Sequence, residues 1–256
     1  MHQSWKKYYN VENGFMNFII VGDKFNKIAD DENIIIAKNF IKNINEGAYS
    51  FQNDIVFLGQ GIKKSDLNTM VEFFVANNIG YSTCMGANKK ENKRFVHKLK
   101  AKNVVITKPN AINAVNFSSM LCFSDNCEIL NDHVTGLHLQ GVLIVEAARQ
   151  MMLSVVENFF LKDKERFNKR FTILNISSNF NQFLFPFSVE IVANIKILSS
   201  NKNKSIAEIY CDFIQNECVC ATVIIKFYTH NEEFIMERED MLAKKVISQI
   251  AKIENM

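Results

Sequence analysis

The sequence predicts an α+β fold in which an antiparallel sheet wraps a long central helix, preceded by a small β-α-β-α-β unit. Three observations predict it. The segment from Gly141 to Phe160 is apolar on nearly every face, which is typical of a helix enclosed by protein. After residue 103 the pattern alternates between apolar and polar residues, as in half-buried antiparallel strands. The first ninety residues instead alternate short apolar runs with helical spacing.

Composition narrows the class of protein. The 256 residues allow one large domain or two small ones, and 48% hydrophobic residues are ample for a core. A net charge of +3 does not indicate nucleic-acid binding, and the basic stretch 89–100 is interpreted as a solvated connector. Since the N-terminus does not resemble a secretion signal and no segment has the pattern of a membrane span, we expect a cytoplasmic protein with reduced thiols and no inserted helix.

The predicted N-terminal unit covers residues 1–92. Its expected strands lie at 15–21, 54–58 and 81–84, with helices at about 34–44 and 65–77 between them. Two crossover helices imply parallel strands. The Gly59-Gln60-Gly61 loop lacks the full signature of a phosphate cradle, so we interpret it as a tight turn. The unit is free to dock on the next domain, to shape a substrate entrance or to bind a partner.

The second predicted domain covers residues 93–230, and residues 231–256 form a C-terminal amphipathic helix. Its expected strands are 104–107 and 112–123 before the central helix, and 171–180, 187–198, 205–215 and 217–228 after it. Asn216 marks a tight turn between the last two strands. Cys218 and Cys220 should point to one face as small core side chains, because neighbouring residues of a strand alternate between its two faces.

Polar residues gather at one place on the central helix. Glu146, Arg149 and Gln150 stand at positions i, i+3 and i+4 and therefore share a face. Burial raises the pKa of a carboxyl group, which would suit Glu146 as a general acid, although an ion pair with Arg149 is the alternative. His133, in the loop before the helix, is a candidate proton shuttle, and Asp132 could orient it or cap a turn.

These residues carry a family resemblance. The string GVLIVEAARQ resembles the GVLxxEAxxQ of β-hydroxyacyl-carrier-protein dehydratases, a branch of the hotdog superfamily. The strings DHVTG and EAARQ together resemble more closely the hotdog domains of A-factor (γ-butyrolactone) biosynthesis proteins. The resemblance covers roughly residues 95–230 and implies a curved antiparallel sheet round a central helix. Departures from both branches are the missing Pro-Gly pairs of the dehydratase loop and the extra residues LHLQG before the helix.

The resemblance implies roles for the site residues. His133 would act as base with Glu146, and the amide of Gly141 would hold a thioester carbonyl. Arg149 would bind a carboxylate or phosphate of the acceptor, such as glycerone phosphate. The other expected substrate-binding residues are Gln150, Gly136 and Val142.

The function expected from this resemblance is an A-factor-type enzyme. It would transfer an acyl group, β-ketoacyl groups included, from an acyl carrier protein or CoA thioester to a small hydroxyl or phosphorylated acceptor. The substrate is the only acyl carrier needed, and no further cofactor or metal is expected. Sites of this superfamily form between two domains, which implies a homodimer. The alternatives are dehydration of a β-hydroxyacyl thioester, thioester hydrolysis, and a non-catalytic acyl-binding or interaction module.

Overall fold

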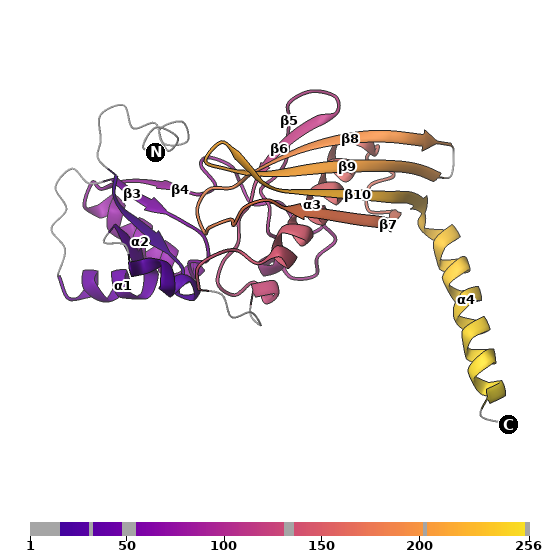
Figure 1. Cartoon of the computed structure of the whole chain (residues 1–256), viewed down its shortest axis with the longest axis horizontal. Coiled ribbons are helices and arrows are strands. Elements are labelled where there is room, and N and C mark those ends of the chain that lie inside the picture. The colour runs from indigo at the N-terminus through magenta and orange to yellow at the C-terminus, as the bar shows by residue number, and fades with distance from the viewer. Residues whose placement is uncertain (1–15, 31–32, 48–54, 131–135, 202–203, 254–256) are drawn as a thin grey trace.

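A computed structural model describes residues 16–30, 33–47, 55–130, 136–201 and 204–253, and arranges them around two separate sheets (Figure 1). A parallel sheet of four strands forms the N-terminal unit at one end of the molecule. An antiparallel sheet of six strands with a helix against it forms the larger part. The α+β class and the hotdog arrangement expected from the sequence are therefore confirmed. The boundaries predicted for the three domains stay predictions.

The N-terminal unit contains one strand more than the sequence pattern predicted. Its elements are β1 (Met16–Val21), the 3-10 helix η2 (Asp23–Asp30), β2 (Ile34–Ile36), α1 (Ala37–Asn45), β3 (Ile55–Leu58), α2 (Lys64–Ala76) and β4 (Gly80–Thr83). All its strand pairs are parallel, in the order β2-β1-β3-β4. Helical spacing had assigned Ile34 to a helix. The run of three isoleucines pairs with β1 instead, because β-branched side chains favour a strand.

The Gly59-Gln60-Gly61 loop joins this unit to the larger domain. The buried Gln60 side chain donates from Nε2 to the carbonyl of Leu121 (2.6 Å) and accepts from the N–H of Phe123 at Oε1 (3.1 Å). Its backbone N–H donates to the carbonyl of Pro186 (2.8 Å). The tight-turn interpretation was therefore incomplete, since the loop is also a docking contact, one of the roles left open for this unit.

The antiparallel sheet is built by strands that come before and after the central helix in the sequence. They are β5 (Asn110–Ala111), β6 (Asn116–Met120), β7 (Lys169–Phe180), β8 (Glu190–Ser200), β9 (Lys204–Gln215) and β10 (Cys218–Asn231), in the order β5-β6-β8-β9-β10-β7. In place of the strand expected at 104–107, only Ile106 and Thr107 form isolated bridges, with Leu121 and Lys90 respectively. The other expected strands are present, and the four after the helix lie within a few residues of their predicted bounds.

A local irregularity changes which side chains of β10 are buried. Asn216 and Glu217 both have positive φ (53° and 64°) and form the tight turn into this strand. The pairing with β9 then shifts between Val219 and Ala221, which is a β-bulge. As a result Cys220 is buried, whereas Cys218 and Val219 are exposed. The expectation that Cys218 is a core side chain on the same face as Cys220 was wrong, because a bulge breaks strict alternation.

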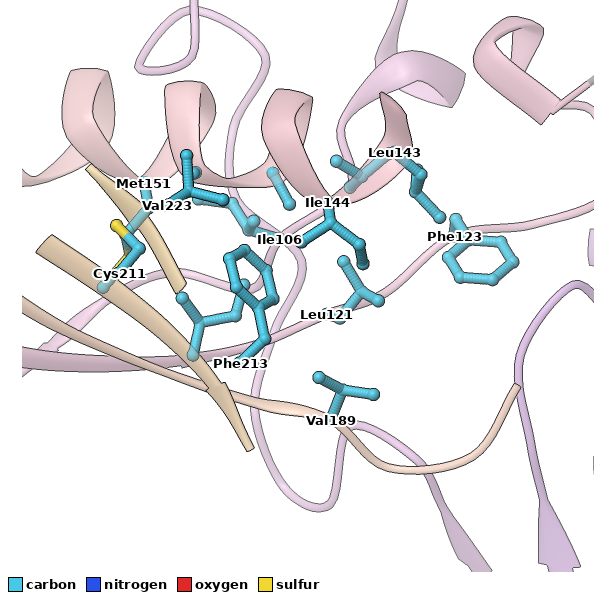
Figure 2. Packing of buried hydrophobic residues seen from close by; sticks show 14 of the residues in the cluster. Ile106, Leu121, Phe123, Leu143, Ile144, Met151, Val189, Cys211, Phe213 and Val223 are labelled. Atoms are coloured by element: carbon cyan, nitrogen blue, oxygen red, sulfur yellow. The ribbon is translucent and has the colours of Figure 1, made fainter. Parts of the chain in front are cut away.

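The core lies between the sheet and the central helix α3 (Gly141–Val155), which continues as a π-helical turn, η5 (Val156–Phe160). Figure 2 shows Leu143, Ile144 and Met151 of α3 facing Phe213 and Val223 of the sheet. All five are buried. The prediction of one long helix from Gly141 to Phe160 is confirmed, with a π turn at its end, and ten of the 15 residues of α3 are buried.

The last element, α4 (Glu232–Ile253), extends away from the body at the end opposite the N-terminal unit (Figure 1). It corresponds to the expected amphipathic helix, and several of its apolar side chains are exposed. None of the helices in the described part of the chain is long and apolar enough to cross a membrane.

Candidate functional site

The central helix is covered by protein except on one face of its first half. Of its 15 residues, ten are buried. The five that are at least partly accessible are Gly141, Val142, Val145, Glu146 and Arg149. Helical geometry places Val142, Val145, Glu146 and Arg149 side by side on this face. We call it the α3 window, and it contains four of the candidate site residues predicted from the sequence.

Glu146 is the centre of a charged cluster in the α3 window. Arg149 donates two hydrogen bonds to its carboxylate, from Nε to Oε2 and from Nη2 to Oε1, each 2.8 Å long. Gln150 donates from Nε2 to Oε1 (2.8 Å), and Lys98 Nζ lies 2.9 Å from the same oxygen. Because two cations surround one carboxylate, the cluster has a net charge of +1.

The electrostatics of Glu146 differ from the sequence expectation. Burial by itself would raise the pKa of this carboxyl group, but the hydrogen bonds from Arg149, Gln150 and Lys98, with the charge of Arg149, outweigh it and lower the pKa. Glu146 is therefore an ionised carboxylate near neutral pH. The expectation of a raised pKa and a general acid was wrong, and the alternative of an ion pair with Arg149 is what the structure shows.

Gln150 is fully buried and holds three groups. Its Oε1 accepts from the N–H of Val105 (2.9 Å), and its Nε2 donates to the carbonyl of Asn103 (2.8 Å) as well as to Glu146. Of the two roles weighed for Gln150, holding Glu146 or holding substrate, the contacts show the first. It also ties the helix to the preceding segment, because both backbone groups would otherwise be buried without a partner.

Lys98 was missed by sequence reasoning. The stretch 89–100 looked like a solvated connector, but Val96 is buried and Lys98 crosses to Glu146 on the central helix. The connector interpretation therefore fails at these positions. In the sequence, the only sign of this contact is the apolar Val96 two places before Lys98. Its partner Glu146 lies 48 positions further along the chain.

A second carboxylate lies at the far end of the central helix. Glu157, fully buried in the π turn, accepts from the N–H of Phe167 (3.0 Å) at Oε2 and lies 2.9 Å from His97 Nε2 at Oε1. Three turns separate Glu157 from Glu146 along one side of the helix. Two neighbouring residues thus contact the helix at both carboxylates: His97 pairs with Glu157 and Lys98 pairs with Glu146.

Gly141 begins the central helix and packs closely against β7. A Cβ atom at this position would lie 3.1 Å from Cζ of Phe180. The first N–H groups of a helix have no acceptor within the helix and carry the positive end of its dipole. Val142 beside it is 68% exposed. The start of α3 is thus accessible for a polar group of a ligand, as the resemblance implied for Gly141.

Asp132 and His133 lie outside the residues that the structure describes. The chain resumes at Gly136, which has a positive φ (86°) and accepts from the N–H of Lys27 in the N-terminal unit (3.2 Å). Gly136 is therefore a contact between the candidate loop and η2. His138 lies against Phe183, with ring centroids 4.6 Å apart and the rings tilted by 38°.

The arrangement can bind an anion beside an apolar surface. Arg149 uses Nε and Nη2 on Glu146, and its side chain is 26% exposed, while that of Lys98 is 23% exposed. A guanidinium has five N–H donors and an ammonium has three, so both cations keep donors for a ligand. Val142 and Val145 provide the apolar side of the window.

The known proteins that this chain resembles match the part that contains the central helix and the antiparallel sheet. A family model described as the AfsA A-factor biosynthesis hotdog domain matches residues 86–230, more than half of the chain. No curated protein matches.

Among solved structures, a thioesterase from Haemophilus influenzae is 14% identical over 57% of this chain and 94% of its own, with a TM-score of 0.38. A conserved protein from Pseudomonas aeruginosa is 13% identical over 54% of this chain and 99% of its own, with a TM-score of 0.37. A hypothetical thioesterase from Streptococcus pneumoniae, solved with coenzyme A, is 7% identical over 48% and 84%, with a TM-score of 0.31.

Proposed function

The chain belongs to the A-factor biosynthesis hotdog family, and from this membership we propose that it is an acyltransferase acting on acyl thioesters. Its donor would be an acyl or β-ketoacyl thioester of CoA or an acyl carrier protein. Its acceptor would be a small alcohol that carries a phosphate or carboxylate group. The α3 window supports this proposal, because it places an arginine with free donors beside an apolar surface at the start of the central helix.

The proposed reaction forms one ester bond and breaks one thioester bond. The acceptor hydroxyl oxygen attacks the thioester carbonyl carbon, the C–S bond breaks, and the thiol leaves with the proton lost by the hydroxyl. His133 would carry that proton, with Asp132 orienting the imidazole. The N–H groups at Gly141 would stabilise the charge that develops on the carbonyl oxygen.

Arg149 is the proposed binding residue for the acceptor anion. Its planar guanidinium suits phosphate or carboxylate, and Glu146 holds it in place through two hydrogen bonds. Glu146 would act as a positioning residue rather than as a proton donor, because its pKa is lowered. Gln150 would support Glu146 from behind, whereas Gly136 and Val142 would shape the surroundings of the acyl group.

Thioester hydrolysis is the second candidate activity. An ionised carboxylate is a suitable base for a water molecule, and Glu146 is ionised near neutral pH. Dehydration is less well supported, since it would need an acid at the position where the pKa is lowered. A non-catalytic acyl-binding module would use the same window without turnover.

We also propose a homodimer. The edge strand β7 has four exposed apolar side chains, Ile173, Leu174, Ile176 and Phe180. Apolar side chains on an unpaired edge strand favour association with a second chain. Phe180 touches Gly141 at the start of α3, so a second chain on β7 would also border the α3 window.

The test is mass spectrometry of reactions with a panel of acyl- and β-ketoacyl-CoA thioesters, with and without glycerone phosphate. An acylated phosphate product should form with the wild-type protein. Arg149→Ala should lose about 2–3 kcal/mol of acceptor binding, that is, at least tenfold in acceptor KM. Arg238→Ala, which removes an exposed arginine on α4, is the matched control and should behave as the wild type.

The outcomes separate the candidates. Free acid released equally with or without acceptor would replace the transferase by a thioesterase. An unsaturated acyl product from β-hydroxyacyl-CoA would indicate a dehydratase. Retention of an acyl ligand without any turnover, unchanged in His133→Ala and Glu146→Gln, would support the binding module.

A further inference from the structure

A cavity lies between the N-terminal unit and the larger domain, away from the α3 window. Its volume is about 250 Å³. One wall is formed by the end of β3, the first turns of α2 and the end of β4, where Leu58, Leu67 and Cys84 line it. The opposite wall is formed by Lys90, Cys122 and Phe123. Segments of both units thus border one space, which is partly open to solvent.

The position is the carboxyl edge of a parallel sheet, where open α/β sheets bind their ligands. Most of this edge is filled by protein. Gly22 after β1 packs so closely on the loop after β3 that a Cβ atom would lie 1.9 Å from the carbonyl oxygen of Gly61. Gln60 spans the gap to Leu121 and Phe123. The cavity is the part of the edge, over β3 and β4, that these contacts leave open.

The cavity walls are mainly apolar, and two of the lining residues are lysines. Lys64, in the first turn of α2, and Lys90, on the other wall, are both exposed. In the described ranges neither has a carboxylate within ion-pair distance, whereas neighbouring Lys63 is paired with Asp23 (3.3 Å). Asp66 and Asp125 also lie near Lys63. An unpaired lysine on each wall of an apolar space favours an anionic group on an apolar body.

The two cysteines in the walls are buried. Burial is the main cause that raises the pKa of the Cys84 thiol, and it raises that of Cys122 to about 12. Both are therefore neutral and unreactive near pH 7, so they act as apolar wall and not as nucleophiles. The ligand would be held by non-covalent contacts.

We propose that this cavity binds a small amphiphilic anion, a medium-chain carboxylate, with its chain between β3, α2 and Phe123 and its carboxylate between Lys64 and Lys90. The volume holds roughly eight non-hydrogen atoms, by comparison with the ~30 Å³ that a water molecule occupies in the liquid. A nucleotide is too large. Since the ligand would touch both walls, it would stabilise the docking of the two units. The proposal is independent of the acyltransferase activity.

The test is isothermal titration calorimetry of the full chain with octanoate, 1-octanol and inorganic phosphate. Octanoate should bind with one-site saturation, 1-octanol at least tenfold more weakly, and phosphate without saturation. Lys64→Met/Lys90→Met should weaken octanoate binding at least tenfold, because methionine keeps the apolar chain but removes both charges. Lys89→Met/Lys108→Met removes two exposed lysines that do not line the cavity, and it should bind as the wild type.

Three results would overturn the proposal. The first is octanoate affinity unchanged in Lys64→Met/Lys90→Met, which would place the ligand elsewhere, including the α3 window. The second is equal affinity for octanoate and octanol, which would remove the role of charge. The third is no saturable octanoate binding by the wild-type protein. Thioester turnover should be the same in both lysine pairs, so loss of turnover and loss of octanoate binding are separate outcomes.

Discussion

Glu146 shows how neighbours decide the chemistry of one side chain. It lies on a helix with apolar residues all round, yet three donors hold its carboxylate. The free energy that burial costs is outweighed by charge-assisted hydrogen bonds, so the pKa falls. The same residue type in the same helix would be an acid without Arg149 and Lys98.

This lowered pKa makes a prediction about stability and pH. A carboxyl group with a pKa depressed by folding contributes stability above its unfolded pKa, 4.5 for Glu146, and loses it as the pH falls through the folded value. Glu146→Gln should cost about 2 kcal/mol of unfolding free energy at pH 7, because two cations lose their partner. The difference from the wild type should shrink towards pH 3.5 in urea unfolding. For Glu72→Gln, at an exposed position on α2, the difference in unfolding free energy from the wild type should not change with pH. If the difference for Glu146→Gln were also independent of pH, the lowered pKa of Glu146 would be contradicted.

At the scale of elements, the packing between α3 and the sheet depends on strand alternation. In β9, Cys211 and Phe213 face the helix and are fully buried, while Tyr210, the residue before Cys211, lies on the other face and is 37% exposed. The alternation fails in β10, where the bulge after Val219 exposes it, and at the end of β8, where Ile197 is 47% exposed. Ile197 lies beside a register shift in the pairing with β9, which explains why it departs from the alternation.

The core contact of β9 can be tested by one pair of substitutions. Phe213→Ala should lower the unfolding free energy by about 3–5 kcal/mol, because it removes a buried ring and leaves a cavity under α3. Tyr210→Ala on the outer face should cost less than about 1 kcal/mol. Chemical denaturation followed by far-ultraviolet circular dichroism measures both. Similar costs for the two substitutions would mean that the outer face of the sheet is covered as well.

At the scale of the whole molecule, Gln60 links the two sheets. Its side chain forms buried hydrogen bonds with the carbonyl of Leu121 and the N–H of Phe123 in the larger domain. Gln60→Ala should leave both without a partner and cost about 2–4 kcal/mol. In calorimetry we also expect one unfolding transition for the wild type and two for Gln60→Ala. Asn68→Ala on the exposed side of α2 is the control, and an unaltered single transition in Gln60→Ala would contradict the linking role.

The proposed homodimer is a prediction at the same scale. Ile176→Lys on the β7 edge introduces a charge where a second copy would lie, so it should shift the chain to a monomer in light scattering coupled to gel filtration. Ile197→Lys changes an equally apolar, exposed residue on β8 and should leave the mass unchanged. A wild-type monomer, or a dimer that survives Ile176→Lys, would exclude this interface.

The sequence by itself determined most of the elements and their order, because helical and strand periodicity are local and the family strings lie within twenty residues of each other. The central helix, the four long strands after it and the turn at Asn216 were all predictable in this way. Glu146 and Arg149 were predictable as a pair for the same reason, since one helical turn separates them.

Only the tertiary structure decided what lies far apart in the chain. The Lys98–Glu146 contact, the docking of Gln60 on Leu121 and the cavity between the two sheets join segments that local patterns cannot relate. Burial raises the pKa of Glu146, but hydrogen bonds from Arg149, Gln150 and Lys98 together lower it, and only the last of these comes from a distant segment. The strand at Ile34–Ile36 was missed because its three residues form a strand only when β1 lies beside them.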